Sequence, residues 1–131
     1  MMSGDKCKTP DQMTFQELFK MQMKNQDLMI LKGLYGCNWM QQPSLPIDDV
    51  GIAKYHVLQL MSEIGEVLDA DKRWKNFRND KYDKPAKAEE IADCFIVLMN
   101  IAMFSGIDSR ELVETIKNKI EEVQRRVNNV T

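Results

Sequence analysis

Two pairs of carboxylates are the first feature of the sequence that could do chemistry. Glu63 and Glu66 form one pair, and Glu90 and Asp93 form the other after a spacer of 23 residues. Residues three apart share one face of a helix, and both pairs lie within apolar runs of helical period. If the two helices pack face to face, four carboxylates meet inside the protein, where like charges repel and lose hydration. A divalent cation would neutralise them, so the sequence predicts a metal site.

The ligand types favour magnesium, with manganese as a substitute. Hard oxygen ligands without histidine or thiolate select Mg²⁺ or Mn²⁺ over zinc. The single histidine, His56, lies seven residues before Glu63 and belongs to no Glu-x-x-His motif, which argues against a di-iron carboxylate site. The alternative for each acidic pair is a solvated face on a surface helix.

A basic segment begins soon after the first acidic pair. Residues 72–87 hold seven Lys or Arg against two Asp. Magnesium is usually held by a few carboxylates together with substrate phosphates, and Lys or Arg can supply the remaining countercharge. The segment therefore indicates a polyphosphate substrate, unless it is only a solvated loop, and the candidate phosphate ligands are Lys72, Arg73 and Lys75. Trp39 and Trp74 could stack on a nucleobase; otherwise Trp74 could simply close the bundle and Trp39 could anchor its loop. The sequence has no GxxxxGK[ST] phosphate loop.

Four helices are expected to position these groups. Their spans are about 15–34, 50–74, 85–104 and 109–127. Thr14 with Glu17 has the form of a capping box for the first helix, and Pro85 suits the first turn of the third. The prediction is an all-α bundle of four to five helices in a single domain, 13–131, preceded by a flexible tail, 1–12. Gly65 is costly in a helix interior and could mark close approach of another backbone.

Composition restricts the partners. The formal net charge of −2 gives no general attraction to nucleic acid or to an anionic membrane. No apolar run reaches the ~20 residues of a membrane span. The three cysteines, Cys7, Cys37 and Cys94, form no CxxC pair, which is typical of a protein in the reducing cytoplasm.

The two acidic pairs and their spacing resemble the ExxE…ExxD signature of the all-α nucleoside triphosphate pyrophosphohydrolases, which include the dimeric dUTPases, MazG-like enzymes and dCTPases. Two further segments look like the dimeric dUTPase branch and its phage members. One is Glu17-Leu18-Phe19-Lys20-Met21-Gln22, and the other is Arg73-Trp74-Lys75 after the first acidic pair. The resemblance covers roughly residues 14–127.

The resemblance implies a function and a set of residue roles. The expected activity is Mg²⁺-dependent hydrolysis of a nucleoside triphosphate, first of all dUTP, to the monophosphate and pyrophosphate. One carboxylate of the Glu63 and Glu66 pair would help activate the water. Basic residues of the last helix, here Lys119 and Arg126, would contact phosphate, although Val123 stands where the family often has asparagine.

The resemblance also bears on the base and on assembly. Amides can read the donors and acceptors of uracil, so Gln22, Asn25 and Asn100 join Trp39 as base-binding candidates. Ordinary capping and core hydrogen bonds are the alternative for the three amides. Because the family builds its core across subunits, a homodimer or homotetramer is expected. The alternatives are a MazG-like house-cleaning pyrophosphatase or a dCTPase and, from another class, a non-catalytic helical interaction module.

Overall fold

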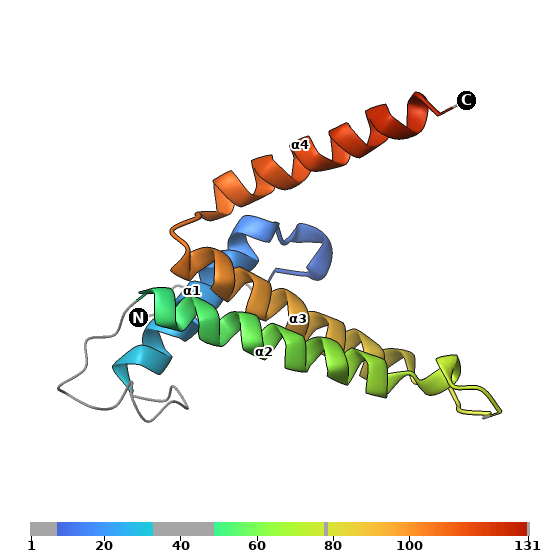
Figure 1. Ribbon diagram of the computed structural model, residues 1–131. Coiled ribbons are helices and arrows are strands. Elements are labelled where there is room, and N and C mark those ends of the chain that lie inside the picture. Colours follow the sequence, from blue (N-terminus) through green and yellow to red (C-terminus); the bar gives the residue numbers. More distant parts are fainter. Residues whose placement is uncertain (1–7, 33–48, 78, 131) are drawn as a thin grey trace.

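The computed structural model describes residues 8–32, 49–77 and 79–130, and these residues fold as helices joined by short segments (Figure 1). No strand occurs in these ranges, which confirms the all-α prediction. The elements are η1 (Pro10–Gln12), α1 (Phe15–Leu31), α2 (Asp49–Ala70), η3 (Lys72–Trp74), α3 (Lys84–Phe104) and α4 (Ser109–Asn128), where η denotes a 3-10 turn.

Local capping fixes the starts of three helices. The Thr14 hydroxyl accepts the Glu17 N–H at 3.2 Å, but the Glu17 carboxylate binds Lys8 at 2.8 Å rather than completing a capping box. Asp83 caps α3, where Pro85 lies in the first turn, and Asp108 caps α4. Each cap satisfies a backbone donor that the first turn leaves unpaired.

The N-terminal segment is described only from residue 8 onward. There a single 3-10 turn, η1, precedes α1, and the Lys8 ion pair attaches this segment to the first turn of α1. Residues 1–7 of the expected tail lie outside the described residues.

The second helix is shorter than predicted. It ends at Ala70 instead of Trp74, and Asp71 takes an extended conformation with φ −135° and ψ 97°. The reason is local hydrogen bonding, because the Asp71 carboxylate accepts the Arg73 N–H at 3.2 Å and thereby caps η3. Short acidic side chains compete with the helix in this way. The segment that was expected to continue the helix is a separate turn.

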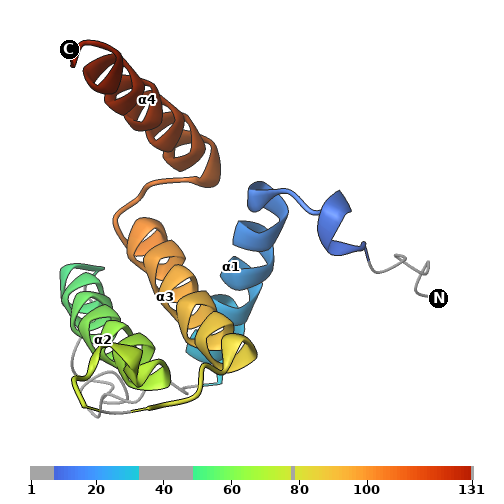
Figure 2. The same ribbon diagram turned by 90° about the vertical axis from the view of Figure 1, so that its right-hand side faces the viewer.

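The helices α2 and α3 form an antiparallel pair, and α1 packs across α3 (Figures 1 and 2). The fully buried core lies mainly where α1 meets α3, at Phe19, Met99 and Ala102, against which Phe15, Met103 and Leu112 pack. The left-handed φ of 75° at Gly106 reverses the chain after α3.

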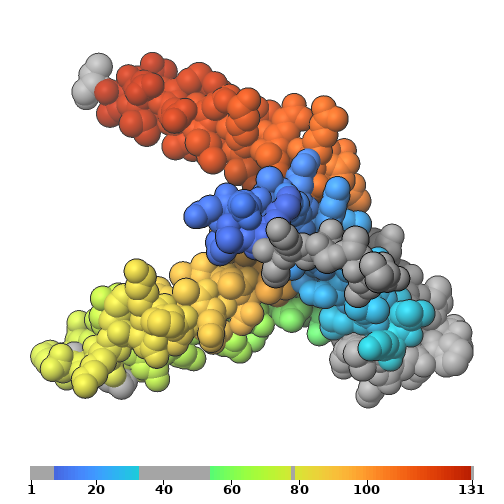
Figure 3. Space-filling model, turned by 180° about the vertical axis from the view of Figure 1, so that it is seen from behind, coloured from blue at the N-terminus to red at the C-terminus, as the bar shows by residue number. Residues whose placement is uncertain are grey.

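Helix α4 leaves this core as an arm. It has no buried residue, and in the space-filling view it projects away from the α2–α3 pair (Figure 3). Its salt-bridged polar residues lie beside an apolar stripe that borders an open groove of about 730 Å³. The stripe residues that line the groove are Ile116, Ile120, Val123 and Val127.

The chain exposes more surface than a compact protein of its size. Its accessible surface is 10761 Å², whereas a compact monomer of 15.2 kDa is expected to expose about 7,100 Å². Within the described ranges no single helix is long and apolar enough to cross a membrane; only α3 and α4 taken as a bent pair, at 114°, meet that test of length and composition.

Candidate metal centre

The structure brings the two acidic pairs together across the α2–α3 interface. Glu63 and Glu66 come from α2, and Glu90 and Asp93 come from α3. Each residue offers one carboxylate oxygen, and these four oxygens all lie within 4.8 Å of one another. The three-residue spacing places both members of each pair on the facing sides of the helices, as the sequence predicts.

The cluster is less enclosed than expected. Glu63 and Glu90 are half-buried, whereas Glu66 and Asp93 are exposed. One oxygen of Glu63 (Oε2) and one of Glu90 (Oε2) are nevertheless buried without a hydrogen-bond partner. Buried carboxylate oxygens normally accept a donor or bind a cation. The cluster thus has a buried side that lacks donors and an open side that faces solvent.

Electrostatics within the cluster disfavour full ionisation. Burial, followed by the hydrogen bond and charge of Glu66, raises the pKa of Glu63. For Glu90 the hydrogen bond with Glu66 is the main cause of the raised pKa, and burial comes second. The pKa of the neighbouring Cys94 thiol is also raised, first by burial and then by the carboxylates. No ion pair joins any of the four carboxylates to a basic group in the described part of the chain.

These residues fit a hard divalent cation. The two unpartnered buried oxygens are unsatisfied acceptors, the ligand set is all oxygen, and Glu66 and Asp93 are open to solvent. Magnesium typically uses one or two protein carboxylates and keeps the remaining positions for water and phosphate. A pair of ions held about 3.5–4 Å apart is the arrangement used by many phosphoryl-cleaving enzymes.

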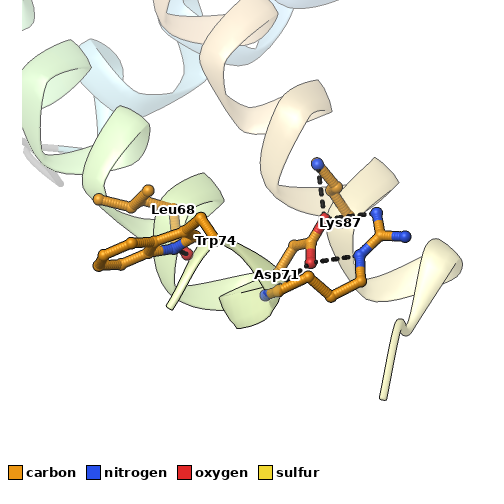
Figure 4. Close-up of polar contacts among 5 residues, drawn as sticks. Leu68, Asp71, Trp74 and Lys87 are labelled. Carbon is orange, nitrogen blue, oxygen red and sulfur yellow. Dashed lines mark hydrogen bonds and ion pairs between the residues drawn. The ribbon is translucent and has the colours of Figure 1, made fainter. Parts of the chain in front are cut away.

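Beyond the end of α2, part of the basic segment is engaged by one carboxylate (Figure 4). The Arg73 guanidinium donates from Nε to Asp71 Oδ1 and from Nη2 to Asp71 Oδ2, each at 2.8 Å, and Lys87 Nζ donates to Asp71 Oδ2 at 2.8 Å. These contacts, first Arg73 and then Lys87, hold the pKa of Asp71 far below its usual range. Arg73 also lies over the ring of Tyr82, at 3.7 Å from the centroid.

The other two predicted phosphate ligands of this segment are differently placed. Lys75 Nζ lies 5.4 Å from the centroid of the Trp74 ring, and Lys72 has no ion-pair partner among the described residues. Trp74 donates from Nε1 to the Leu68 carbonyl at 3.2 Å (Figure 4). It therefore packs against the end of α2, while its side chain remains 55% exposed.

Two of the base-binding candidates bond to each other. Gln22 on α1 donates from Nε2 to Asn100 Oδ1 on α3 at 2.9 Å, and both side chains are buried. Asn25 donates to Gln22 Oε1 at 3.3 Å. Gln22 and Asn25 border a cavity of about 350 Å³ with Leu28, Met29 and Lys32. The Gln22–Asn100 bond joins α1 to α3, and Trp39 lies outside the described residues.

The two basic candidates on α4 are not brought to the carboxylates within one chain. Lys119 Nζ lies 3.3 Å from Glu122 Oε2, and Arg126 pairs with the same carboxylate. Because α4 packs on α1 and projects from the rest of the molecule (Figure 3), these side chains lie on the arm.

Comparison with known proteins adds no assignment. No family model, curated protein or solved structure matches this chain.

Sequence reasoning missed two residues of this region, Asp71 and Lys87. Lys87 precedes Glu90 by three residues, so the same helical spacing that revealed the acidic pairs could have placed it on the same face. Asp71 gave no such signal, because it was assigned to the interior of a longer helix. His56 is a core residue, 2% exposed and stacked on Phe104 at 5.2 Å, and burial lowers its pKa.

Proposed function

We propose that this protein is a Mg²⁺-dependent nucleoside triphosphate pyrophosphohydrolase, with dUTP as the first substrate candidate. The observation that carries the proposal is the four-carboxylate cluster, whose buried oxygens on Glu63 and Glu90 lack donors. The resemblance to the ExxE…ExxD pyrophosphohydrolases supplies the reaction class, and dUTP follows from the segments that look like the dimeric dUTPase branch.

The four carboxylates would hold the metal, and the chain would position the reactants. Bound Mg²⁺ would supply charge neutralisation for the triphosphate and for the oxygens that attack and leave. Water would attack the α-phosphorus, the bond from that phosphorus to the bridging oxygen would break, and pyrophosphate would leave. One carboxylate of the Glu63 and Glu66 pair would accept the proton of the attacking water. Glu66 is exposed to solvent, so water could reach it.

Countercharge for the triphosphate would come from the basic segment beside the cluster. Lys72 and Lys75 carry no competing ion pair among the described residues, whereas Arg73 is held by Asp71 through two hydrogen bonds. Lysine ammonium groups are flexible point charges that can follow phosphate oxygens. We therefore assign the first phosphate contacts to Lys72 and Lys75.

We propose that the active form is a homodimer or homotetramer. The chain exposes about 3,600 Å² more than a compact monomer of its mass, and a standard interface covers about 800 Å² on each partner. The apolar stripe of α4 is exposed, including Ile120 at 55% and Val123 at 54%. A second copy that covers this stripe would also bring a second arm, with its Lys119 and Arg126, close to the first chain.

A substrate panel tests the activity. Purified protein is incubated with Mg²⁺ and dUTP, dCTP, dTTP, dATP or dGTP, and the products are separated by anion-exchange chromatography. Monophosphate with pyrophosphate is the expected result, and EDTA should abolish it. Orthophosphate release or no turnover would refute the reaction class. Preference for dCTP, or broad activity on all five, would change only the substrate, to a dCTPase or a MazG-like enzyme.

Two variants distinguish catalysis from a contaminating hydrolase. Glu66→Gln should lose turnover because it removes a metal ligand, whereas Glu89→Gln should keep it. Glu89 is exposed and adjacent to Glu90, but it does not belong to the cluster. If both variants hydrolyse dUTP like the unmodified protein, the cluster is not the catalytic site. A protein that neither turns over nor binds Mg²⁺ would instead fit the helical interaction module.

A further inference from the structure

One ion pair crosses from the end of α2 to α3 close to the acidic cluster. Lys87 Nζ on α3 donates to Asp71 Oδ2 at 2.8 Å, and the same carboxylate binds Arg73 through two hydrogen bonds of 2.8 Å (Figure 4). The Asp71 residue is only 8% exposed. A carboxylate that accepts charge-assisted hydrogen bonds from two cations has a well-defined orientation. Asp71 thus joins the segment after α2 to the beginning of α3.

The Asp71–Lys87 ion pair (the tie) lies near the acidic cluster in the antiparallel pair of α2 and α3. Glu66 of α2 and Glu90 of α3 each contribute an oxygen to the cluster, and these oxygens lie within 4.8 Å of one another. Asp71 lies five residues after Glu66, and Lys87 lies three residues before Glu90. Since residues three apart share a helix face, Lys87 is on the side of α3 that carries the acidic pair. In sequence position, the Asp71–Lys87 contact therefore follows the acidic cluster toward the end of α2.

The Asp71–Lys87 ion pair opposes the repulsion within the acidic cluster. Four carboxylates at one interface repel each other and so push α2 and α3 apart when no cation is bound. Among the ion pairs of the described residues, Asp71–Lys87 alone links the segment that ends α2 to α3. The Tyr82 ring contacts both cations, with its centroid 3.7 Å from the Arg73 guanidinium and 5.8 Å from Lys87 Nζ.

We propose that Asp71 is a positioning residue of the metal site: through Lys87 and Arg73 it fixes the separation and register at which the two acidic pairs face each other. It touches neither metal nor substrate. The inference rests on the proposed function, because it needs the cluster to bind Mg²⁺. Beyond that function, the Asp71–Lys87 contact, which lies outside the cluster, would set the geometry of the four carboxylates before Mg²⁺ binds.

Substitution of Lys87 tests the proposal, because the two possible roles of this side chain predict opposite changes in Mg²⁺ affinity. Lys87 is a positive charge one helical turn from Glu90. If it acted only as a charge, its removal by Lys87→Met would strengthen Mg²⁺ binding, because the potential at the cluster would become more negative. If it acts through the tie to Asp71, the same substitution weakens Mg²⁺ binding because the acidic pairs lose their register.

The experiment measures Mg²⁺ affinity of the full chain by isothermal titration with MgCl₂. Asp71→Asn and Lys87→Met should each weaken binding about tenfold, the low end for residues that support metal ligands from outside. The double variant should lose little more Mg²⁺ affinity than either single variant, because both substitutions break the same contact. Lys87→Arg should stay within about twofold, as expected of a substitution that keeps the ion pair. The matched control is Asp69→Asn, which removes an exposed negative charge near the same end of α2 without breaking the tie.

The outcomes separate this inference from the proposed function. Tighter binding in Lys87→Met, or equal affinities in Asp71→Asn and Asp69→Asn, would overturn the positioning role while leaving the metal site standing. Absence of Mg²⁺ binding in the unmodified protein would overturn both. If circular dichroism shows that Asp71→Asn does not fold, the comparison of Lys87→Met with Lys87→Arg decides: weaker binding in the first and recovery in the second supports the tie.

Discussion

Replacing Glu66 by glutamine should change the stability of the protein in opposite directions with and without magnesium. Without metal, Glu66 adds a negative charge to a cluster that already holds three carboxylates. Its removal relieves repulsion and should stabilise the fold. With Mg²⁺, the same carboxylate would be one of the four proposed ligands, and its removal should cost most of the stabilisation that the metal provides. The order of the two melting temperatures should therefore reverse.

The magnitude follows from the separation of the oxygens. Unit charges 4.8 Å apart repel by about 0.9 kcal/mol in water. Glu66 is exposed, so the aqueous value applies and salt reduces the sum over its three neighbours. We expect a gain of about 1 kcal/mol without metal, or about 3–5 °C in Tm for a chain of this length. A ligand at a hundredfold excess over its Kd stabilises by about 2.7 kcal/mol, or about 10 °C.

The assay is a thermal unfolding series followed by circular dichroism, in EDTA and in increasing MgCl₂. The unmodified protein should melt below Glu66→Gln in EDTA and above it in saturating Mg²⁺. Glu89→Gln, on the same helix as Glu90 but outside the cluster, should follow the unmodified protein in both conditions. Equal Mg²⁺ shifts in all three proteins would show that the cluster does not hold the metal, and the reasoning from carboxylate repulsion to a metal site would be wrong.

Three further predictions concern pH, backbone and assembly. Because Glu63 and Glu90 have raised pKa values, the folded state keeps protons that the unfolded state releases, and their contribution to metal-free stability falls as the pH rises from 4.5, the unperturbed value, through the folded pKa. The lowered pKa of His56 acts in the opposite direction up to 6.5, so the measurement is the difference between the unmodified protein and Glu63→Gln in urea titrations. The unmodified protein should lose stability relative to Glu63→Gln as the pH rises, and a constant difference would contradict this. Gly65→Ala should add about 0.5–1 kcal/mol in chemical denaturation, because nothing lies within 4 Å of an added Cβ; a loss would indicate that another copy packs there. Ile120→Asp should shift sedimentation to the monomer, while Asn118→Asp, outside the apolar groove, should not; a monomeric unmodified protein would refute self-association.

The parts of the fold that local rules determine could be predicted from the sequence. Thr14 and Asp108 cap their helices because a short polar side chain before an apolar periodic run satisfies free backbone donors. The carboxylate cluster was predictable for a similar reason, since it needs only helical spacing and two helices that pack. The early end of α2 could not be predicted from the sequence. The conformation of Asp71 depends on Lys87, 16 residues later in the chain, as well as on Arg73 nearby.

The sequence predicts Lys72, Arg73 and Lys75 alike as phosphate ligands. In the structure their side chains differ in the contacts that they make. Arg73 has two of its donors committed to Asp71 and its face on Tyr82, so a phosphate would have to displace a buried carboxylate to bind it through those donors. Lys72 has no such competitor among the described residues. If Lys72 binds phosphate because no carboxylate competes for it, Lys72→Met should raise the KM for the triphosphate several-fold with Mg²⁺ affinity unchanged. Arg73→Met should instead lower Mg²⁺ affinity, because it removes one of the two partners that orient Asp71.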